Sequence, residues 1–179
     1  MIEDIRLTYL LEEPAKELIV KPILDKNNQS RYIGNAVDCI MDYTSRNPYY
    51  IQIFCSRLVE YMNSKKLIKV TEADVKDVAE SFIKGEQALS EEKFDNLIRA
   101  GETEDLQEYP DDDILNLLHN ISVGSKNIGY CNRNDIDSFE DKDYEGKILK
   151  NLVDREVLEE KNNNYKIQVK LFQEWLLNH

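Results

Sequence analysis

The most regular pattern of apolar positions lies between residues 51 and 62, where apolar side chains recur every three or four residues. Its members are Ile51, Phe54, Cys55, Leu58, Val59 and Met62. This spacing places them on one face of a helix that buries that face. Asn47 is a favoured N-cap and Pro48 a favoured first helical residue, whereas Asn63 and Ser64 follow the last apolar position. The pattern therefore predicts a helix that begins at Pro48 and ends near Asn63.

Four shorter apolar patterns predict further helices on either side of this one. They cover residues 14–22, 33–44, 71–83 and 90–98. Thr71 and Asp74 have the spacing of a capping box at the start of the third of these helices. Ser90 is expected to cap the last one. Together the five patterns predict an all-helical domain over residues 1–100.

The helical pattern breaks over residues 101–113, which are acidic, contain Gly and Pro, and have little periodicity. We expect residues 101–110 to form a linker between two domains. Beyond the linker, the pattern predicts helices over 114–121, 134–139 and 144–156, a hairpin that turns at 161–164, and a closing helix over 171–176. Three helices followed by a hairpin is the order of a winged helix. The predicted fold is mainly α, with an α+β winged-helix domain over residues 111–179.

The net charge of −12 adds information about partners. Residues 1–105 carry 14 basic and 20 acidic side chains, and residues 106–179 carry 9 and 15, so that each part has a charge of −6. Such a chain repels phosphate groups, which disfavours DNA and anionic membranes as partners. No apolar run reaches the roughly 18 residues that span a membrane. The acidic opening MIEDIRLTYLLEEP is unlike a signal peptide, so we expect a cytoplasmic protein.

Cysteine and histidine usage indicates neither a metal site nor a catalytic centre. Cys39, Cys55 and Cys131 are widely spaced and form no CxxC pair, and the first two fall on apolar helical faces typical of core thiols. His119 stands beside two leucines and is expected to be structural, whereas His179 is expected to be mobile. Nothing in the local sequence pairs a nucleophile with a base. The sequence therefore predicts no catalytic residue and no metal ligand.

Four segments carry a resemblance to a known family. Residues 44–52, TSRNPYYIQ, resemble the T-G-G-N-P-Y-x-I-Q segment of the lid in AAA and STAND signalling ATPases, and residues 70–75, VTEADV, are similar to the start of the next lid helix. Residues 152–158, LVDREVL, resemble the end of the third winged-helix helix, and residues 171–176, LFQEWL, resemble the usual ending of such chains. The chain thus resembles the lid and winged-helix region of these ATPases, including archaeal origin-recognition-like ones.

The resemblance implies a nucleotide contact in the lid. In STAND proteins the proline of this segment packs against the adenine base, a role that falls to Pro48 with Arg46 and Asn47 beside it. Ser45 and Arg46 stand where the family has glycines. The chain has no GxxxxGK[ST] sequence and no Walker B strand, so no phosphate cradle is present. We therefore expect no cofactor and no enzymatic activity for this chain, with ATP or ADP bound by a longer parent.

The resemblance leaves two kinds of partner for the winged helix. Its predicted third helix and wing carry the basic residues Lys147, Lys150, Arg155, Lys161 and Lys166. Acidic neighbours balance the charge of that helix, whereas a DNA-reading helix normally has a basic excess. We therefore expect a regulatory region that relays nucleotide state to a protein partner, namely the nucleotide-binding domain of a longer parent or a separate protein. The alternative is a DNA-binding module of a replication initiator or a transcription regulator.

Overall fold

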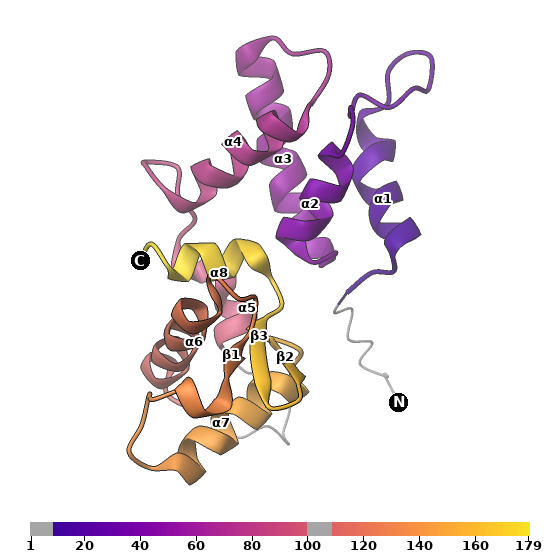
Figure 1. Cartoon of the computed structure of the whole chain (residues 1–179). Helices are drawn as coiled ribbons and strands as arrows, with labels where there is room; N and C mark the ends of the chain where they lie inside the picture. The colour runs from indigo at the N-terminus through magenta and orange to yellow at the C-terminus, as the bar shows by residue number, and fades with distance from the viewer. Residues whose placement is uncertain (1–8, 100–108) are drawn as a thin grey trace, which may run out of the picture. The chain divides into compact units, whose positions relative to one another are not determined.

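The computed structural model describes residues 9–99 and 109–179. Over these residues the chain is mainly helical and carries one antiparallel sheet of three strands (Figure 1). It divides into two compact units, Met1–Gln87 and Ala88–His179. No helix among the described residues combines the length and the apolar character that a membrane crossing requires.

The first unit is built around one long helix. Its elements are α1 (Glu12–Val20), η1 (Lys21–Ile23), α2 (Ala36–Thr44), α3 (Pro48–Lys65) and α4 (Glu72–Ile83). α3 packs against the other three α-helices. Its Phe54 and Leu58 are fully buried, and the Phe54 ring lies 5.3 Å from the ring of Phe82 on α4. The apolar stripe that predicts this helix therefore forms the centre of the first core.

The ends of the helices follow from local chemistry. The Asn47 side chain accepts backbone N–H groups of the first turn of α3, and Pro48 begins that helix. Thr71 and Asp74 form a complete capping box at the start of α4, as their spacing predicts. α3 continues past Asn63 to Lys65, and Lys66 then ends it in the left-handed conformation, with φ 55°.

The second unit combines four α-helices with the sheet. Its elements are η2 (Glu91–Phe94), α5 (Asp95–Ile98), α6 (Asp111–Ser125), β1 (Cys131–Asn132), η3 (Arg133–Asp135), α7 (Lys142–Asp154), β2 (Leu158–Lys161), β3 (Asn164–Ile167) and α8 (Lys170–Leu176). The strand order is β1-β3-β2, and both pairs are antiparallel. Asn162 and Asn163, both at positive φ, form the two-residue turn between β2 and β3. Two positive φ values in succession are typical of a type I′ hairpin turn, which asparagine tolerates.

The segment from Leu89 to Ile98 belongs to the second unit, although the sequence pattern groups it with the first. The Trp175 indole N–H donates to the Leu89 carbonyl at 2.8 Å, and the Phe94 ring lies 4.8 Å from the Phe172 ring of α8. Apolar periodicity alone predicts a helix but not the core against which it packs. Most of the predicted linker, residues 101–108, lies outside the described residues.

Two smaller details of the second unit differ from the sequence predictions. The helix predicted over residues 134–139 is replaced by the single turn η3, and strand β1 precedes it without an apolar pattern to indicate it. Cys131 in this strand is buried, whereas Cys39 and Cys55 are half-buried. Burial raises the pKa of the Cys55 thiol to about 11, which keeps it protonated near neutral pH.

Candidate functional site

The turn that the resemblance assigns to nucleotide contact has an unusual backbone. Ser45 and Arg46 both adopt positive φ, at 49° and 63°, where glycine is the preferred residue. The Arg46 carbonyl accepts the backbone N–H of Leu10 at 3.0 Å, which ties this turn to the segment that precedes α1. The lid segment of the resembling family has glycines at both positions. Ser45 and Arg46 thus occupy two successive backbone conformations that favour glycine.

The three residues predicted to contact nucleotide, Arg46, Asn47 and Pro48, differ in how exposed their side chains are. The Asn47 carboxamide is buried and accepts the N–H groups of Tyr49 and Tyr50 at 3.0 and 3.5 Å. These amides at the start of α3 are therefore used by the N-cap. Pro48 is half-buried and Arg46 is exposed. Pro48 and Arg46 are consequently the members of the set that an external group can reach, and Asn47 holds the helix start.

The basic residues predicted to face DNA or a partner are not brought together as one surface. Lys147 pairs with Asp143 of the preceding turn at 2.9 Å. Lys166 stands directly opposite Glu159 in the β2–β3 ladder. Lys150 and Lys161 are exposed. Of these four lysines, Lys150 and Lys161 are therefore the ones most accessible to a phosphate group.

Arg155 has a structural position, which corrects its assignment as a surface contact. The residue is 6% exposed, and its guanidinium donates hydrogen bonds of 2.6–3.5 Å to a group of backbone carbonyls at the end of α5. These carbonyls belong to Asn96, Leu97, Ile98 and Arg99. The last carbonyls of a helix lack partners within it and attract a cation. Arg155 therefore fastens α5 to the end of α7 instead of facing a ligand.

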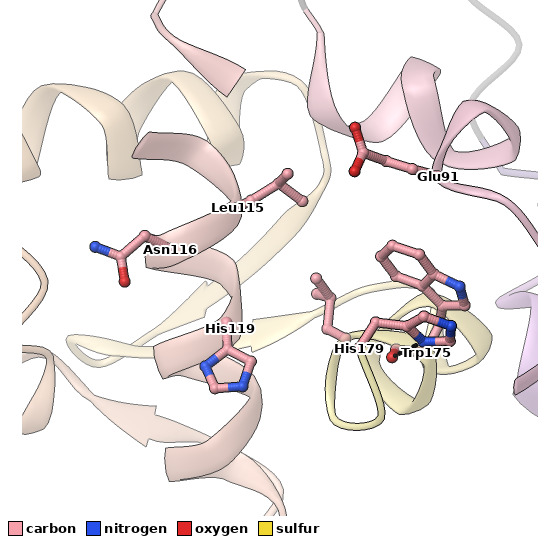
Figure 2. Close-up of a pocket in the computed structure, with 7 residues that line it drawn as sticks. Glu91, Leu115, Asn116, His119, Trp175 and His179 are labelled. Carbon is pink, nitrogen blue, oxygen red and sulfur yellow. Dashed lines mark hydrogen bonds between the residues drawn. The ribbon is translucent and has the colours of Figure 1, made fainter. Parts of the chain in front are cut away.

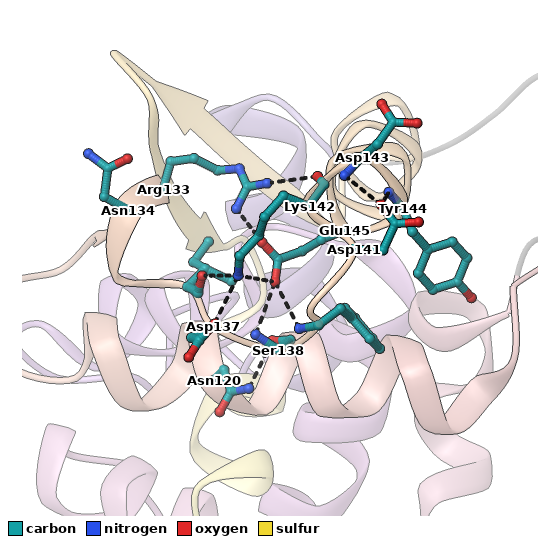
Figure 3. Close-up of polar contacts among 12 residues, drawn as sticks. Asn120, Arg133, Asn134, Asp137, Ser138, Asp141, Lys142, Asp143, Tyr144 and Glu145 are labelled. Carbon is teal, nitrogen blue, oxygen red and sulfur yellow. Dashed lines mark hydrogen bonds and ion pairs between the residues drawn. The ribbon is translucent and has the colours of Figure 1, made fainter.

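A buried carboxylate organises the segment that precedes α7 (Figure 3). Glu145 is fully buried, forms an ion pair with Arg133, and accepts the N–H groups of Ser138 and Phe139 at 3.0 and 3.2 Å. Lys142 adds a longer ion pair at 3.4 Å. Burial opposes ionisation of this carboxyl, but the hydrogen bonds from Arg133, Ser138 and Phe139 outweigh it and lower its pKa below 4.5. The charge is fully partnered, so this cluster is a structural support for the segment.

The position of Glu145 was detectable from the helical period. It lies three and four residues before the buried Ile148 and Leu149, on the inner face of α7. An acidic residue at a core position is rarely left without a partner. The period of α7 thus indicates a buried, partnered carboxylate at Glu145 and not one of the surface charges that balance its lysines.

A pocket of about 300 Å³ lies in the second unit and brings together both histidines of the chain (Figure 2). α6 contributes Leu115, Asn116 and His119, the start of η2 contributes Glu91, and the end of α8 contributes Trp175, Leu176 and His179. The volume is at the lower end of the range for ligand pockets, so the space suits one side chain or a small organic group.

An aromatic pair forms one wall of this pocket. The His179 imidazole stacks on the Trp175 indole with ring centres 4.4 Å apart and an angle of 15° between the planes. The His179 Nδ1 atom lies 3.1 Å from the Trp175 carbonyl oxygen, and Figure 2 shows the two rings one over the other. On α6, Figure 2 shows Leu115 and His119 on the opposite side of the pocket. The lining therefore combines apolar side chains with polar ones, namely Leu115, Trp175 and Leu176 with Glu91, Asn116, His119 and His179.

Nothing in the local sequence around either histidine indicates this pocket. His119 is exposed on α6, on the same face as Asp112 and Asn116, which precede it by seven and three residues. This spacing places His119 on the polar face of the helix and away from the buried leucines. Its proximity to the end of α8 depends on tertiary packing, which no local pattern encodes.

Within residues 9–99 and 109–179, no group of three or more His, Cys, Asp or Glu side chains is placed to hold a metal ion. The pocket with the two histidines therefore does not present a metal-ligand set in the described part of the chain.

Comparison with protein-family models, with curated proteins and with solved structures finds no match to this chain. The assignment of a function to each candidate site therefore rests on the geometry and charge of its residues.

Charge is distributed unequally between the two units. Residues 88–179 carry 11 basic and 21 acidic side chains, a net charge of −10, whereas residues 1–87 carry 12 and 14, a net charge of −2. A division at residue 105 conceals this difference, because it assigns six acidic residues of the second unit to the first. The second unit is thus the strongly acidic one, and its field attracts cations and repels phosphates.

Proposed function

We propose that the chain is a non-catalytic regulatory region, a lid followed by a winged helix, that relays the nucleotide state of an ATPase domain to a protein partner. The order α6, β1, η3, α7, β2, β3 and α8 with the sheet order β1-β3-β2 supports the winged-helix part, in which a single turn stands in place of the second helix. The capped helix start at Asn47 and the capping box at Thr71 support the lid part, since they coincide with the two lid segments that carry the resemblance.

The observation that carries the preference for a protein partner is the loss of basic surface on α7 and the hairpin. Arg155 is buried against carbonyls, Lys147 is paired, and Lys166 faces a glutamate across the ladder. The unit around them has a net charge of −10. Affinity for duplex DNA scales with the number of phosphates that basic side chains neutralise. Lys150, Lys161 and the exposed but paired Lys147 neutralise few of them in an acidic unit.

The lid part would act through Arg46 and Pro48. Both lie at the turn whose two consecutive residues of positive φ match the glycine positions of the resembling family. In a longer parent or a complex, Pro48 would pack against the base of ATP or ADP, and Arg46 would lie beside it. Relay then requires that the lid makes different contacts in the two nucleotide states. Pro48→Ala would test this in the assembled ATPase, where it should weaken nucleotide affinity while Asn47 still caps α3.

The alternative is DNA binding by the winged helix, which one observation favours. Asn162 and Asn163 form the polar turn of the hairpin, and strand β2 ends next to this turn at the exposed Lys161. Lys150 is exposed on α7. A wing and a helix of this kind are the elements that contact DNA in helix-turn-helix proteins.

Fluorescence anisotropy with a randomised duplex pool at two salt concentrations separates the two functions. Under the protein-partner proposal, the dissociation constant at physiological salt is no tighter than about 10⁻⁴–10⁻⁶ M, the range of non-specific binding. Submicromolar binding with a steep salt dependence, abolished by Lys161→Glu together with Lys166→Glu, would instead establish the DNA-binding alternative. Lys93→Glu together with Lys126→Glu makes the same change of charge outside α7 and the hairpin, and provides the control for a general field effect.

A further inference from the structure

The pocket between η2, α6 and α8 has a charge pattern that selects the class of its ligand. Glu91 supplies the one side-chain carboxylate among the seven lining residues, and none of them is a lysine or an arginine. Glu91 is exposed, and Glu92 follows it directly. An anion would therefore meet a carboxylate in a unit that already carries −10, whereas a cation is attracted by both the carboxylate and the unit.

The walls of the pocket suit a cation that has an apolar stem. Leu115 and Leu176 supply aliphatic surface, and Trp175 with His179 supplies a planar aromatic edge. Arginine combines an aliphatic stem with a planar guanidinium that stacks on aromatic rings and pairs with carboxylates. A volume of about 300 Å³ accommodates one such side chain together with water.

The indole is held firmly by the core and supports the exposed His179 ring that stacks on it, which is the aromatic surface that a ligand can reach. The indole N–H donates to the Leu89 carbonyl at 2.8 Å, and its ring lies 5.1 Å from the Phe94 ring. Trp175 is only 6% exposed. Its orientation is therefore fixed by the core, and a ligand need not order it.

We propose that this pocket binds an arginine side chain presented by a basic segment of the partner protein. The guanidinium lies near Glu91 and the aromatic pair, and the aliphatic stem lies against Leu115 and Leu176. This assignment rests on the protein-binding function proposed above and names the chemistry of the partner. It places the contact surface on η2, α6 and α8.

The chain contains a single tryptophan, so its emission reports on this pocket alone. The probe is a short acetylated and amidated peptide with one arginine between glycines. Its control contains citrulline, which has nearly the same shape without the charge. Titration of the 179-residue chain with the arginine peptide should give a saturable change in Trp175 emission, and the citrulline peptide should give none at the same concentrations.

Two adjacent carboxylates supply matched variants. Glu91→Gln should raise the dissociation constant of the arginine peptide about fivefold, the effect of losing an exposed ion pair worth about 1 kcal/mol. Glu92→Gln removes the same charge one residue away from the pocket lining and should change the affinity less than about twofold. Both residues are exposed, so neither change should disturb the fold, which far-UV circular dichroism checks.

An equal response to the citrulline peptide, an equal loss in the two variants, or no saturable response would each overturn the arginine-pocket assignment. These outcomes are separate from the fate of the proposed function. If the arginine peptide does not bind but DNA binding in the anisotropy experiment is weak, only the arginine pocket is ruled out and the protein-partner function remains. Submicromolar DNA binding removes that function whatever the peptide does, and then an arginine response of Trp175 would establish only the pocket.

Discussion

At the scale of single residues, Glu145 determines the conformation of a segment that has little regular structure of its own. Residues 136–141 follow one turn of 3-10 helix and precede α7, and two of their backbone N–H groups end on this carboxylate. Asn120 of α6 supports the same segment by donating to the Ser138 hydroxyl at 2.8 Å. The segment is therefore fixed by side chains where no helix supplies backbone partners.

Replacing Glu145 with Gln should destabilise the second unit by about 3–5 kcal/mol at neutral pH, the usual loss when one member of a buried ion pair is removed. Arg133 would keep its charge, and only 20% of its side-chain surface is exposed to water. Thermal or urea unfolding followed by Trp175 fluorescence measures the loss. Glu140→Gln, an exposed acid in the same segment, is the control and should shift stability by less than about 0.5 kcal/mol.

The Glu145 contribution has a defined pH dependence. Its pKa is lowered in the folded state relative to 4.5, so the unfolded chain takes up the proton first as pH falls. The stabilisation is fully present above pH 4.5 and is lost as pH falls through the folded-state pKa. The difference in unfolding free energy between the wild-type chain and Glu145→Gln should therefore shrink below pH 4.5. A difference that stays constant down to pH 3 would contradict the assigned ionised state.

At the scale of elements, two glycines in neighbouring helices have opposite surroundings. A Cβ atom added at Gly124 of α6 would lie 2.4 Å from the Cys131 Sγ atom and 3.2 Å from its Cβ atom. A Cβ atom added at Gly146 of α7 would meet only the Arg133 Nη2 atom, at 4.0 Å. Gly124 therefore permits the close approach of α6 to strand β1, whereas Gly146 has no steric role.

The same substitution should consequently have opposite effects at the two sites. Gly124→Ala should cost about 1–3 kcal/mol, because the buried Cys131 has little space to move. Gly146→Ala should stabilise by about 0.5–1 kcal/mol, because alanine loses less backbone entropy in a helix. Denaturant unfolding followed by Trp175 fluorescence compares them.

A double variant identifies the cause of the Gly124 effect. Cys131→Ala shortens the side chain that the new methyl group would meet, so the two changes together should cost less than the sum of the single changes. Additive losses would mean that α6 and β1 do not approach each other at this point.

How far the sequence predicts the elements depends on how local their determinants are. α3 follows from its apolar stripe, and α4 follows from Thr71 and Asp74, because spacing and caps act within a few residues. Strand β1 is only two residues long, and it exists because β3 supplies its partner. The helix predicted at 134–139 does not form, because the N–H groups of Ser138 and Phe139 donate to the Glu145 carboxylate and not to helical carbonyls.

The candidate sites were predictable to a smaller extent. The helix start at Asn47 and Pro48 follows from local N-cap preferences, whereas the nucleotide contact of Arg46, Asn47 and Pro48 stays a prediction. Arg155 was assigned to a surface, since its sequence neighbours give no indication of the α5 carbonyls that it meets. The pocket at Trp175 joins segments that are far apart in the chain, so it required the tertiary structure.

At the scale of the whole molecule, the position of the domain boundary determines which residues are needed for each core. The structure assigns Ala88–Ile98 to the second unit, whereas the acidic segment after residue 100 is the boundary that composition predicts. Phe94 stacks on Phe172, and Arg155 donates to the end of α5. A winged-helix domain that starts at residue 111 would lack these partners.

Two fragments test this boundary directly. Residues 88–179 should unfold cooperatively, with Trp175 emission typical of a buried indole. Residues 111–179 should show red-shifted emission and no cooperative transition, because they lose the Leu89 carbonyl that accepts the indole N–H and the aromatic cover from Phe94.

Each buried apolar side chain of the missing segment contributes about 1.5–3 kcal/mol, and the Arg155 guanidinium would be left buried without its carbonyl acceptors. The combined loss is of the same order as the total stability of a small domain, about 5–15 kcal/mol. Equal midpoints for the two fragments in urea would place the boundary at the acidic segment and would show that residues 88–98 are dispensable for the second core.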